Sequence, residues 1–373
     1  MTNNPKINAL TVRIEDFKMQ RLGTIMEPDM TNPMEAGGVL NPAAIRSRDG
    51  NLYLFPRMAT MDNYSRIGIA RVKFNAVGDP CGVERLGIAL EPEAEYEKRP
   101  NGGGCEDPRI TFVEPLDLYL MTYTAFSPEG PRVALAKSAD LLHWERLGLA
   151  NYNTFQHIEF NGINNKDACI FPQVIKDPRG HTALGMLHRP LFPGTSPEEK
   201  ALHKNQAKRN RHQECIWISY LHFNSEKARH WKLSKFISHH PLAAPIQNWE
   251  DLKIGAGTPP ILTRHGWMYL YHGVGEGPHS SSTKKEYRYS AGVMILAADN
   301  PCKILYRSRY PLLSPDLPEE RVGIIADVVF PTGIDRRDDL GKPDRFDVYY
   351  GMADNRIGVA RLDIPEVLPI INY

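Results

Sequence analysis

The sequence predicts an all-β protein, and two observations indicate a five-bladed β-propeller. Short runs of β-branched and aromatic residues recur along the 373 residues between turns rich in Gly, Pro and Asp, while helical periodicity is weak. These runs also form a unit of three candidate strands, called a phrase below. Five copies of it follow one another at a long period, as expected for blades that are each a small antiparallel sheet. A β-sandwich of similar strand number is the alternative, but it does not predict a fivefold phrase.

Each phrase contains three candidate strands. In chain order they are 39–45, 52–57 and 66–72; 105–113, 118–123 and 132–137; 165–171, 182–189 and 215–220; 257–262, 266–273 and 289–296; and 327–333, 346–351 and 356–362. We expect residues 1–373 to form a single propeller domain with a mainly polar N-terminal lead-in (about 1–35). An inserted loop (about 192–212) has no counterpart in the other phrases, and its basic residues fit a solvated charge run better than a partner site.

Composition narrows the class of protein. The chain carries 45 basic and 44 acidic residues, a net charge of +1, which argues against a nucleic-acid or membrane surface. No apolar run approaches the roughly 20 residues that span a bilayer, and the N-terminus lacks a signal-peptide pattern, so we expect a cytoplasmic protein. Five cysteines without a C-x-x-C pair predict reduced thiols rather than disulfides or a zinc site, and we expect no metal.

The loop 101–110 is the strongest local signal. Three glycines lead into Glu106, Asp107 and Arg109 just before an apolar run, so backbone without Cβ atoms delivers charged groups to the start of a strand. A solvated salt-bridge cluster is the structural alternative. The repeat around the loop favours a functional site.

In a propeller the innermost strands surround one axis, so the residues at their starts converge. Polar groups stand at these points, or at the far ends of the second strands, in every phrase: Asn41, Asp107, Lys166, Asp167, Thr258, Asp327, Arg57, Tyr123, His188, Arg189, His272 and Asp354. A core does not need such groups, because burying them unpaired costs several kcal/mol each. For His272 alone, a hydrogen-bonded structural histidine remains an alternative.

Six motifs in this order resemble glycoside hydrolase family 130, the five-bladed propeller β-mannoside phosphorylases and related β-mannosidases. The motifs are Asn41-Pro42-Ala43, Gly103 to Arg109, His188-Arg189-Pro190, Tyr271-His272-Gly273, Val328 to Gly333 and Tyr349 to Asp354. The resemblance covers nearly the whole chain, and it is the combination of motifs that makes it specific.

The resemblance implies inverting cleavage of a β-mannoside by inorganic phosphate, giving α-mannose 1-phosphate. The family's general acid aligns with Asp107, which protonates the leaving oxygen through the 3-hydroxyl of the transferred mannose. An inverting hydrolase needs a second carboxylate to activate water, whereas phosphate is already a nucleophile and needs cations to hold it. Phosphate is thus expected as a co-substrate, with no cofactor.

The resemblance also implies binding residues. For phosphate they are Arg189, Lys166, His272 and Tyr287; for the sugar they are Asn41, Arg57, Arg66, Glu106, Arg109, His188 and Asp354. Asp167 stands where the family usually carries an amide, and its negative charge would weaken phosphate binding unless it points elsewhere.

Two other functions stay open at this point. One is a β-mannosidase that uses water on the same fold, which the cations Lys166, Arg189 and His272 disfavour. The other is a non-catalytic sugar-binding propeller, which Asp107 disfavours. The expected partners are a small carbohydrate and phosphate, with a possible homo-oligomer and no nucleic acid or membrane. The linkage, β-1,2 or β-1,4, and the acceptor sugar are not determined by the sequence.

Overall fold

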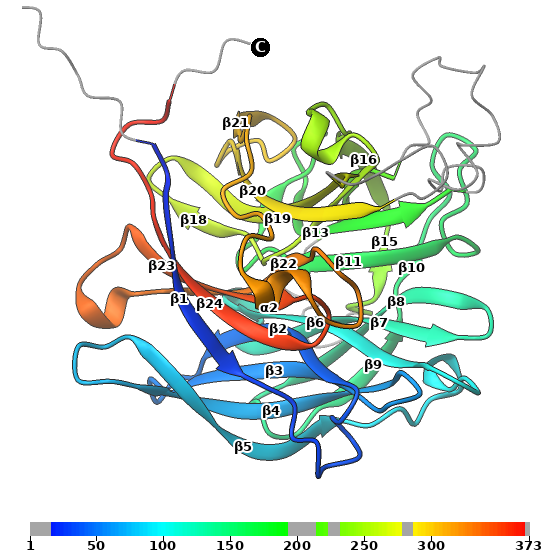
Figure 1. Cartoon of the computed structure of the whole chain (residues 1–373). Helices are drawn as coiled ribbons and strands as arrows, with labels where there is room; N and C mark the ends of the chain where they lie inside the picture. The colour runs from blue at the N-terminus through cyan, green and yellow to red at the C-terminus, as the bar shows by residue number, and fades with distance from the viewer. Residues whose placement is uncertain (1–15, 193–213, 223–231, 278–285, 370–373) are drawn as a thin grey trace, which may run out of the picture.

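Nearly every element of the protein is a β-strand (Figure 1). The computed structural model describes residues 16–192, 214–222, 232–277 and 286–369. Within them helical structure is confined to α2 (Pro318–Arg321) and short 3-10 turns such as Glu95–Glu97. None of the described helices is long and apolar enough to cross a membrane. The all-β prediction is therefore confirmed.

The strands form five antiparallel groups that follow one another along the chain. The first group is β2 (Gly38–Arg46), β3 (Leu52–Ala59), β4 (Tyr64–Phe74) and β5 (Pro80–Leu90), and the second is β6 (Gly103–Val113), β7 (Leu118–Ser127), β8 (Gly130–Ser138) and β9 (Glu145–Leu149). The third is β11 (Asn164–Ile170), β12 (Ile175–Lys176), β13 (Thr182–Leu191), β14 (Ile216–His222) and β16 (Ser238–Ala243). The fourth is β17 (Lys253–Ala256), β18 (Ile261–Thr263), β19 (Gly266–Glu276), β20 (Tyr287–Leu296) and β21 (Ile304–Arg307). The fifth is β22 (Val329–Arg336), β23 (Arg345–Met352), β24 (Arg356–Asp363) and β1 (Lys18–Met26).

Two short parallel pairings lie outside the five antiparallel groups. A parallel bridge between β4 and β6, at Tyr64 with Gly103 and Ser65 with Gly104, joins the first two groups into one sheet of eight strands. Strands β10 (Asn151–Tyr152) and β15 (Lys235–Phe236) pair in parallel beside the third group.

The expected strands agree with the observed ones except at 257–262. Residues 257–260 of that segment connect β17 to β18, because Pro259 and Pro260 have no N–H to donate to a ladder, and only residues 261 and 262 are in β18. The outer strands β5, β9, β16 and β21 were not predicted. They are short or carry exposed polar residues, so their hydrophobic pattern is weak.

The N-terminal lead-in is partly a strand. Within the expected segment of about 1–35, β1 pairs antiparallel with β24 from Lys18 opposite Asp363 to Met26 opposite Ile357. Figure 1 shows the blue β1 crossing beside the red β24. The two ends of the chain therefore share one sheet. The inserted loop expected at about 192–212 lies, from residue 193, outside the described residues.

Buried side chains join each group to the next. Separate apolar clusters connect the first group to the second through Phe55 and Ile110, the second to the third through Leu120 and Met186, and the third to the fourth through Tyr220 and Trp267. Two further clusters connect the fourth group to the fifth through Leu270 and Val348, and the fifth group to the first through Tyr349 and Leu54. Both faces of the groups are thus covered, which explains why many strands are continuously apolar rather than alternating. Since the fifth group packs against the first, the series of contacts between neighbouring groups is closed.

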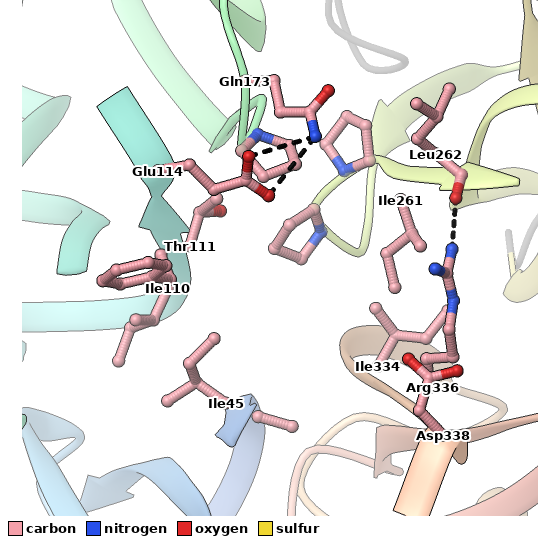
Figure 2. A pocket seen from close by; sticks show the side chains of 15 residues that line it. Ile45, Ile110, Thr111, Glu114, Gln173, Ile261, Leu262, Ile334, Arg336 and Asp338 are labelled. Carbon is pink, nitrogen blue, oxygen red and sulfur yellow. Dashed lines mark hydrogen bonds between the residues drawn. The ribbon is translucent and has the colours of Figure 1, made fainter. Parts of the chain in front are cut away.

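Residues from β2, β6, β18 and β22 and from the segment after β11 line a pocket of about 300 Å³ (Figure 2). Its walls are mainly apolar and include Ile45 from β2, Ile110 from β6, Ile261 from β18 and Ile334 from β22. Around it Gln173 donates hydrogen bonds to Glu114, and Arg336 donates to the carbonyl of Leu262. One residue from most of the groups therefore reaches a common hollow.

Arg21 attaches β1 to the rest of the structure. Its Nε donates to Glu320 Oε1 at 2.7 Å and its Nη2 to Glu320 Oε2 at 2.9 Å, and the Glu320 side chain is fully buried in α2. The hydroxyl of Tyr350 donates to the same carboxylate at 3.0 Å. This network links the N-terminal strand, α2 and β23.

We predict that Arg21→Ala lowers the free energy of unfolding by about 1.5–3 kcal/mol, because a buried carboxylate loses two charge-assisted hydrogen bonds. The matched control is Arg71→Ala, which breaks a pair with Glu84 in which both side chains are 43% exposed. That variant should lose no more than about 1 kcal/mol. Urea unfolding measures both, and equal losses would show that β1 is not held by Arg21.

Candidate active site

Three of the inner strands carry the same local irregularity. The ladders of β2, β6 and β11 shift register at Leu40/Ala43, Glu106/Arg109 and Lys166/Cys169, so that two residues of the inner strand face one of its partner. The residues that open these three β-bulges have positive φ: Asn41 (43°), Asp107 (47°) and Asp167 (55°). Asn and Asp tolerate this left-handed region, and a bulge redirects the side chain that it carries. The same device thus presents three buried polar side chains.

Asp107 is surrounded by hydrogen-bond donors. Its Oδ1 accepts from Asn41 Nδ2 at 2.9 Å and from Arg57 Nη1 at 3.3 Å, while Arg109 Nη1 donates to its main-chain carbonyl at 2.7 Å. Burial alone would raise the pKa of the Asp107 carboxyl. The positive charges of Arg57, Arg109 and Lys166 outweigh burial and lower that pKa below its usual value. With these charges around it, Asp107 is ionised at neutral pH.

Glu106 lies on the other side of Arg57. Arg57 Nη2 donates to Glu106 Oε1 at 2.9 Å, and Lys166 Nζ is 3.8 Å from Glu106 Oε2. Asp354, which follows β23, has a pKa raised to about 6, because burial and the nearby charges of Asp107 and Glu106 outweigh Arg57. Carboxylates and cations thus alternate in this half of the site.

Asp167 organises the second half. Its Oδ2 accepts from Arg189 Nε at 2.6 Å and lies 3.6 Å from His272 Nε2, and its Oδ1 is 3.7 Å from Arg109 Nη2. Burial would raise the pKa of Asp167, but Arg189, His272 and Arg109 hold it well below its usual range. Asp167 therefore points at Arg189 and His272, two of the residues expected to bind phosphate. Its negative charge is thus placed where it would weaken phosphate binding.

Gly255 makes room for this contact. A Cβ atom at position 255 would lie 2.2 Å from Asp167 Oδ2 and 2.4 Å from His272 Cε1. The close approach of Asp167 to His272 therefore depends on a residue without a side chain.

His272 differs from expectation in its charge. Burial lowers the pKa of its imidazole to about 3, although Asp167 opposes that shift. At neutral pH it is an uncharged donor or acceptor and not one of three cations. Arg189 is also constrained, because its Nη1 donates to Glu214 while its Nε donates to Asp167.

Eight of the predicted residues form one continuous set of contacts in which Arg109 reaches from Asp107 to Asp167. They are Asn41, Arg57, Glu106, Asp107, Arg109, Lys166, Arg189 and His272. Asp354 belongs to the same set through its electrostatic interaction with Arg57 and Asp107.

Three predicted residues lie differently. The two ring nitrogens of His188 are within hydrogen-bond distance of Asn165 and Ser219, and its ring stacks on Tyr152, so it is placed as a structural histidine would be. Arg66 pairs with Glu91 at 3.0 Å. Tyr287 begins β20 opposite Glu276, about 13 Å along the strand from the partner of His272.

The sequence reasoning missed Glu214, Gly255 and Phe330. Glu214 follows the inserted segment and belongs to no recognisable motif. Phe330 packs its ring 4.4 Å from that of His272 and 5.6 Å from the guanidinium of Arg109, but an aromatic residue in a strand looks like core. Asp167, in contrast, was among the polar groups expected to converge, and Asn or Asp recurs at the same point of three phrases.

Several buried polar atoms of the site have no hydrogen-bond partner among the described residues. They are Asn41 Oδ1, Arg109 Nη2 and both ring nitrogens of His272. Leaving such a group unsatisfied costs about 1–3 kcal/mol, so a cluster of them is typical of a place where a ligand supplies the missing contacts.

Comparison with known proteins identifies the family of this chain. The family model described as β-1,4-mannooligosaccharide phosphorylase, for glycoside hydrolase family 130, matches residues 11–373. The 1,2-β-oligomannan phosphorylase of Thermoanaerobacter sp. (strain X514) is 30% identical over 360 residues, which are 94% of this chain and 99% of that protein. The β-1,4-mannooligosaccharide phosphorylase of Ruminococcus albus is 36% identical over 291 residues, 75% of this chain and 69% of that one.

Among solved structures, the β-1,2-mannobiose phosphorylase of Listeria innocua in complex with β-1,2-mannobiose has a similar fold. The TM-score is 0.65 at 23% identity, with 93% of this chain and 97% of that chain covered. On the match of the family model to nearly its whole length, this chain belongs to glycoside hydrolase family 130.

Proposed function

We propose that the protein is an inverting β-mannoside phosphorylase that converts a β-mannoside and inorganic phosphate into α-mannose 1-phosphate. The relatives named as mannoside phosphorylases support this reaction. The observation that carries it is the buried set of contacts around Asp107 and Asp167, with four cationic side chains and unsatisfied polar atoms in one place. Such a set can hold an anion beside a carboxylic acid.

In this proposal Asp107 is the general acid and acts through the 3-hydroxyl of the mannose. The lowered pKa of the Asp107 carboxyl is a difficulty for this role, because a general acid must carry a proton. Phosphate offers a resolution. A dianion bound near Lys166 and Arg109 would cancel part of the positive charge that lowers the pKa of Asp107, so the proton would be taken up as the ternary complex forms.

Phosphate must also compete with Asp167, which already neutralises Arg189. We propose that phosphate contacts Lys166, the unsatisfied Nη2 of Arg109 and the neutral His272, together with Arg189. Hydrogen bonds from Asn41, Arg57, Glu106 and Asp354 would place the sugar hydroxyls. Tyr287, at the start of β20, would contact the phosphate.

The β-mannosidase alternative gains one observation from the structure. Asp354, with a pKa of about 6, lies within the electrostatic reach of Asp107, so a second carboxylate that could activate water is present after all. The linkage stays open, because the relatives are named for β-1,2 and for β-1,4 substrates.

We further propose that the five strand groups are the blades of one five-bladed propeller domain. The apolar clusters that return from the fifth group to the first, and the pocket shared by the inner strands, support this arrangement. The reaction would use phosphate as a co-substrate and would require no cofactor. The five free cysteines fit a reducing compartment such as the cytoplasm.

Asp107→Asn tests the acid. The amide keeps the shape of the side chain but cannot transfer a proton, so kcat for release of mannose 1-phosphate should fall by about 10²–10⁴ with little change in thermal stability. Asp140→Asn, in an exposed pair with His143, is the control and should keep full activity. Wild-type turnover by Asp107→Asn would move the acid elsewhere, first to Glu106.

Lys166→Ala tests the phosphate site. Lys166 is better suited than Arg189, because removing Arg189 would leave Asp167 and Glu214 buried without their cation. Loss of one charge-assisted contact of about 1.5–3 kcal/mol should raise the KM for phosphate roughly 10- to 150-fold, with a much smaller effect on the KM for mannoside. Lys137→Ala, whose partner is Glu145, is the control. A larger effect on the mannoside than on phosphate would contradict this placement.

A further inference from the structure

A cluster of Asp177, His181 and His222 lies outside the candidate active site. Asp177 follows β12 and closes the turn to β13, where its Oδ1 accepts hydrogen bonds from the main-chain N–H groups of Arg179 and His181, both at 2.9 Å. Its Oδ2 is 3.1 Å from His181 Nδ1 and 2.8 Å from His222 Nε2. The Asp177 side chain is fully buried, whereas those of His181 and His222 are 54% and 33% exposed.

The two imidazoles come from different parts of the third strand group. His181 immediately precedes β13, and His222 ends β14 opposite Ala183, so the pairing of β13 with β14 places it beside the turn. Their ring centroids are 4.7 Å apart. Forty-five residues separate Asp177 from His222, and no cysteine takes part, so no spacing in the sequence shows the cluster.

The three side chains are close enough together to share one metal ion. One ligand atom from each residue lies within 4.8 Å of the other two. Atoms bound to one ion at about 2.1 Å and at angles near 90–110° are themselves about 3.0–3.4 Å apart, close to the distances between Asp177 and each histidine. The main-chain hydrogen bonds that fix Oδ1 would orient the carboxylate as outer contacts do in metal sites.

We propose that Asp177, His181 and His222 form a binding site for a divalent transition-metal ion such as Zn²⁺. Two imidazoles and one carboxylate suit zinc or nickel, whereas magnesium prefers oxygen ligands alone. The exposure of both histidines leaves the remaining coordination positions open to water.

The site is remote from the proposed chemistry. His181 precedes the first residue of β13 and Arg189 lies near its end, about 26 Å along an extended strand. A bound ion would join the end of β14 to the β12–β13 turn. We therefore expect it to raise thermal stability and to leave turnover unchanged, and the inference does not depend on the proposed function.

The test is calorimetric titration of the full chain, freed of metal with a chelator, with Zn²⁺ and separately with Mg²⁺. We expect one equivalent of Zn²⁺ to bind and to raise Tm, with no binding of Mg²⁺. His181→Ala, His222→Ala and Asp177→Asn should each weaken zinc binding at least tenfold. Asp177→Asn retains an oxygen that can accept the hydrogen bonds of the turn, and His181 is exposed, so these variants should fold even if His222→Ala does not.

His143→Ala is the matched control, because His143 Nδ1 contacts Asp140 Oδ2 at 2.7 Å in an exposed pair that lacks a second histidine. It should bind zinc as the wild type does. Absence of zinc binding to the wild type would overturn the proposal, as would zinc binding that is unaffected by His181→Ala and Asp177→Asn.

Discussion

The arrangement of the site depends most on the contacts of one group, the guanidinium of Arg109. It is buried, and it donates to the carbonyl of Asp107 on its own strand and to that of Gly257 between β17 and β18. It also faces Asp167 on β11 and the ring of Phe330 on β22. One charged group thus ties together four of the five strand groups. Its burial is tolerated because partners on each of these segments compensate its desolvation.

The β-bulges connect this packing to function. A regular inner strand would turn every second side chain toward its neighbouring sheets, where apolar residues fill the space. At Asn41, Asp107 and Asp167 the left-handed backbone interrupts that alternation, so a polar side chain is buried at each of these positions. The charges then stabilise one another: Arg57, Lys166 and Arg109 keep Asp107 ionised, and Asp167 neutralises Arg189. In the proposed reaction, a phosphate that brings its own charge would change this balance and so couple its binding to the protonation of Asp107.

Much of the fold was readable from the sequence, for identifiable reasons. The inner strands follow turns rich in Gly, Pro and Asp and are apolar on both faces, so their positions were predicted well. The outer strands, such as β5, are partly exposed and carry charge, and β1 pairs with a strand more than 300 residues away, as Lys18 does with Asp363. Neither feature leaves a local pattern.

The sequence predicted which residues gather at the site better than it predicted their contacts and charges. Asp107 and Arg109 belong to one motif and Lys166 stands at the start of a phrase, and the structure brings the three together. The sequence could not show that burial would make His272 neutral, or that Asp167 would point at Arg189. Both results come from packing between segments far apart in the chain, and Gly255, which lies against Asp167 and His272, carries no local signal of that contact. His188 illustrates the converse, since a motif residue at the right place in a phrase is held by Asn165 and Ser219 inside its sheet.

The reaction is the central claim, and the identity of its product tests that claim most directly. The purified protein is incubated with β-1,2- and β-1,4-mannobiose, with and without inorganic phosphate, and the products are separated and identified. The account predicts α-mannose 1-phosphate from at least one isomer, formed in phosphate and absent without it. Release of free mannose at the same rate in phosphate-free buffer would contradict the account and assign the site to a hydrolase.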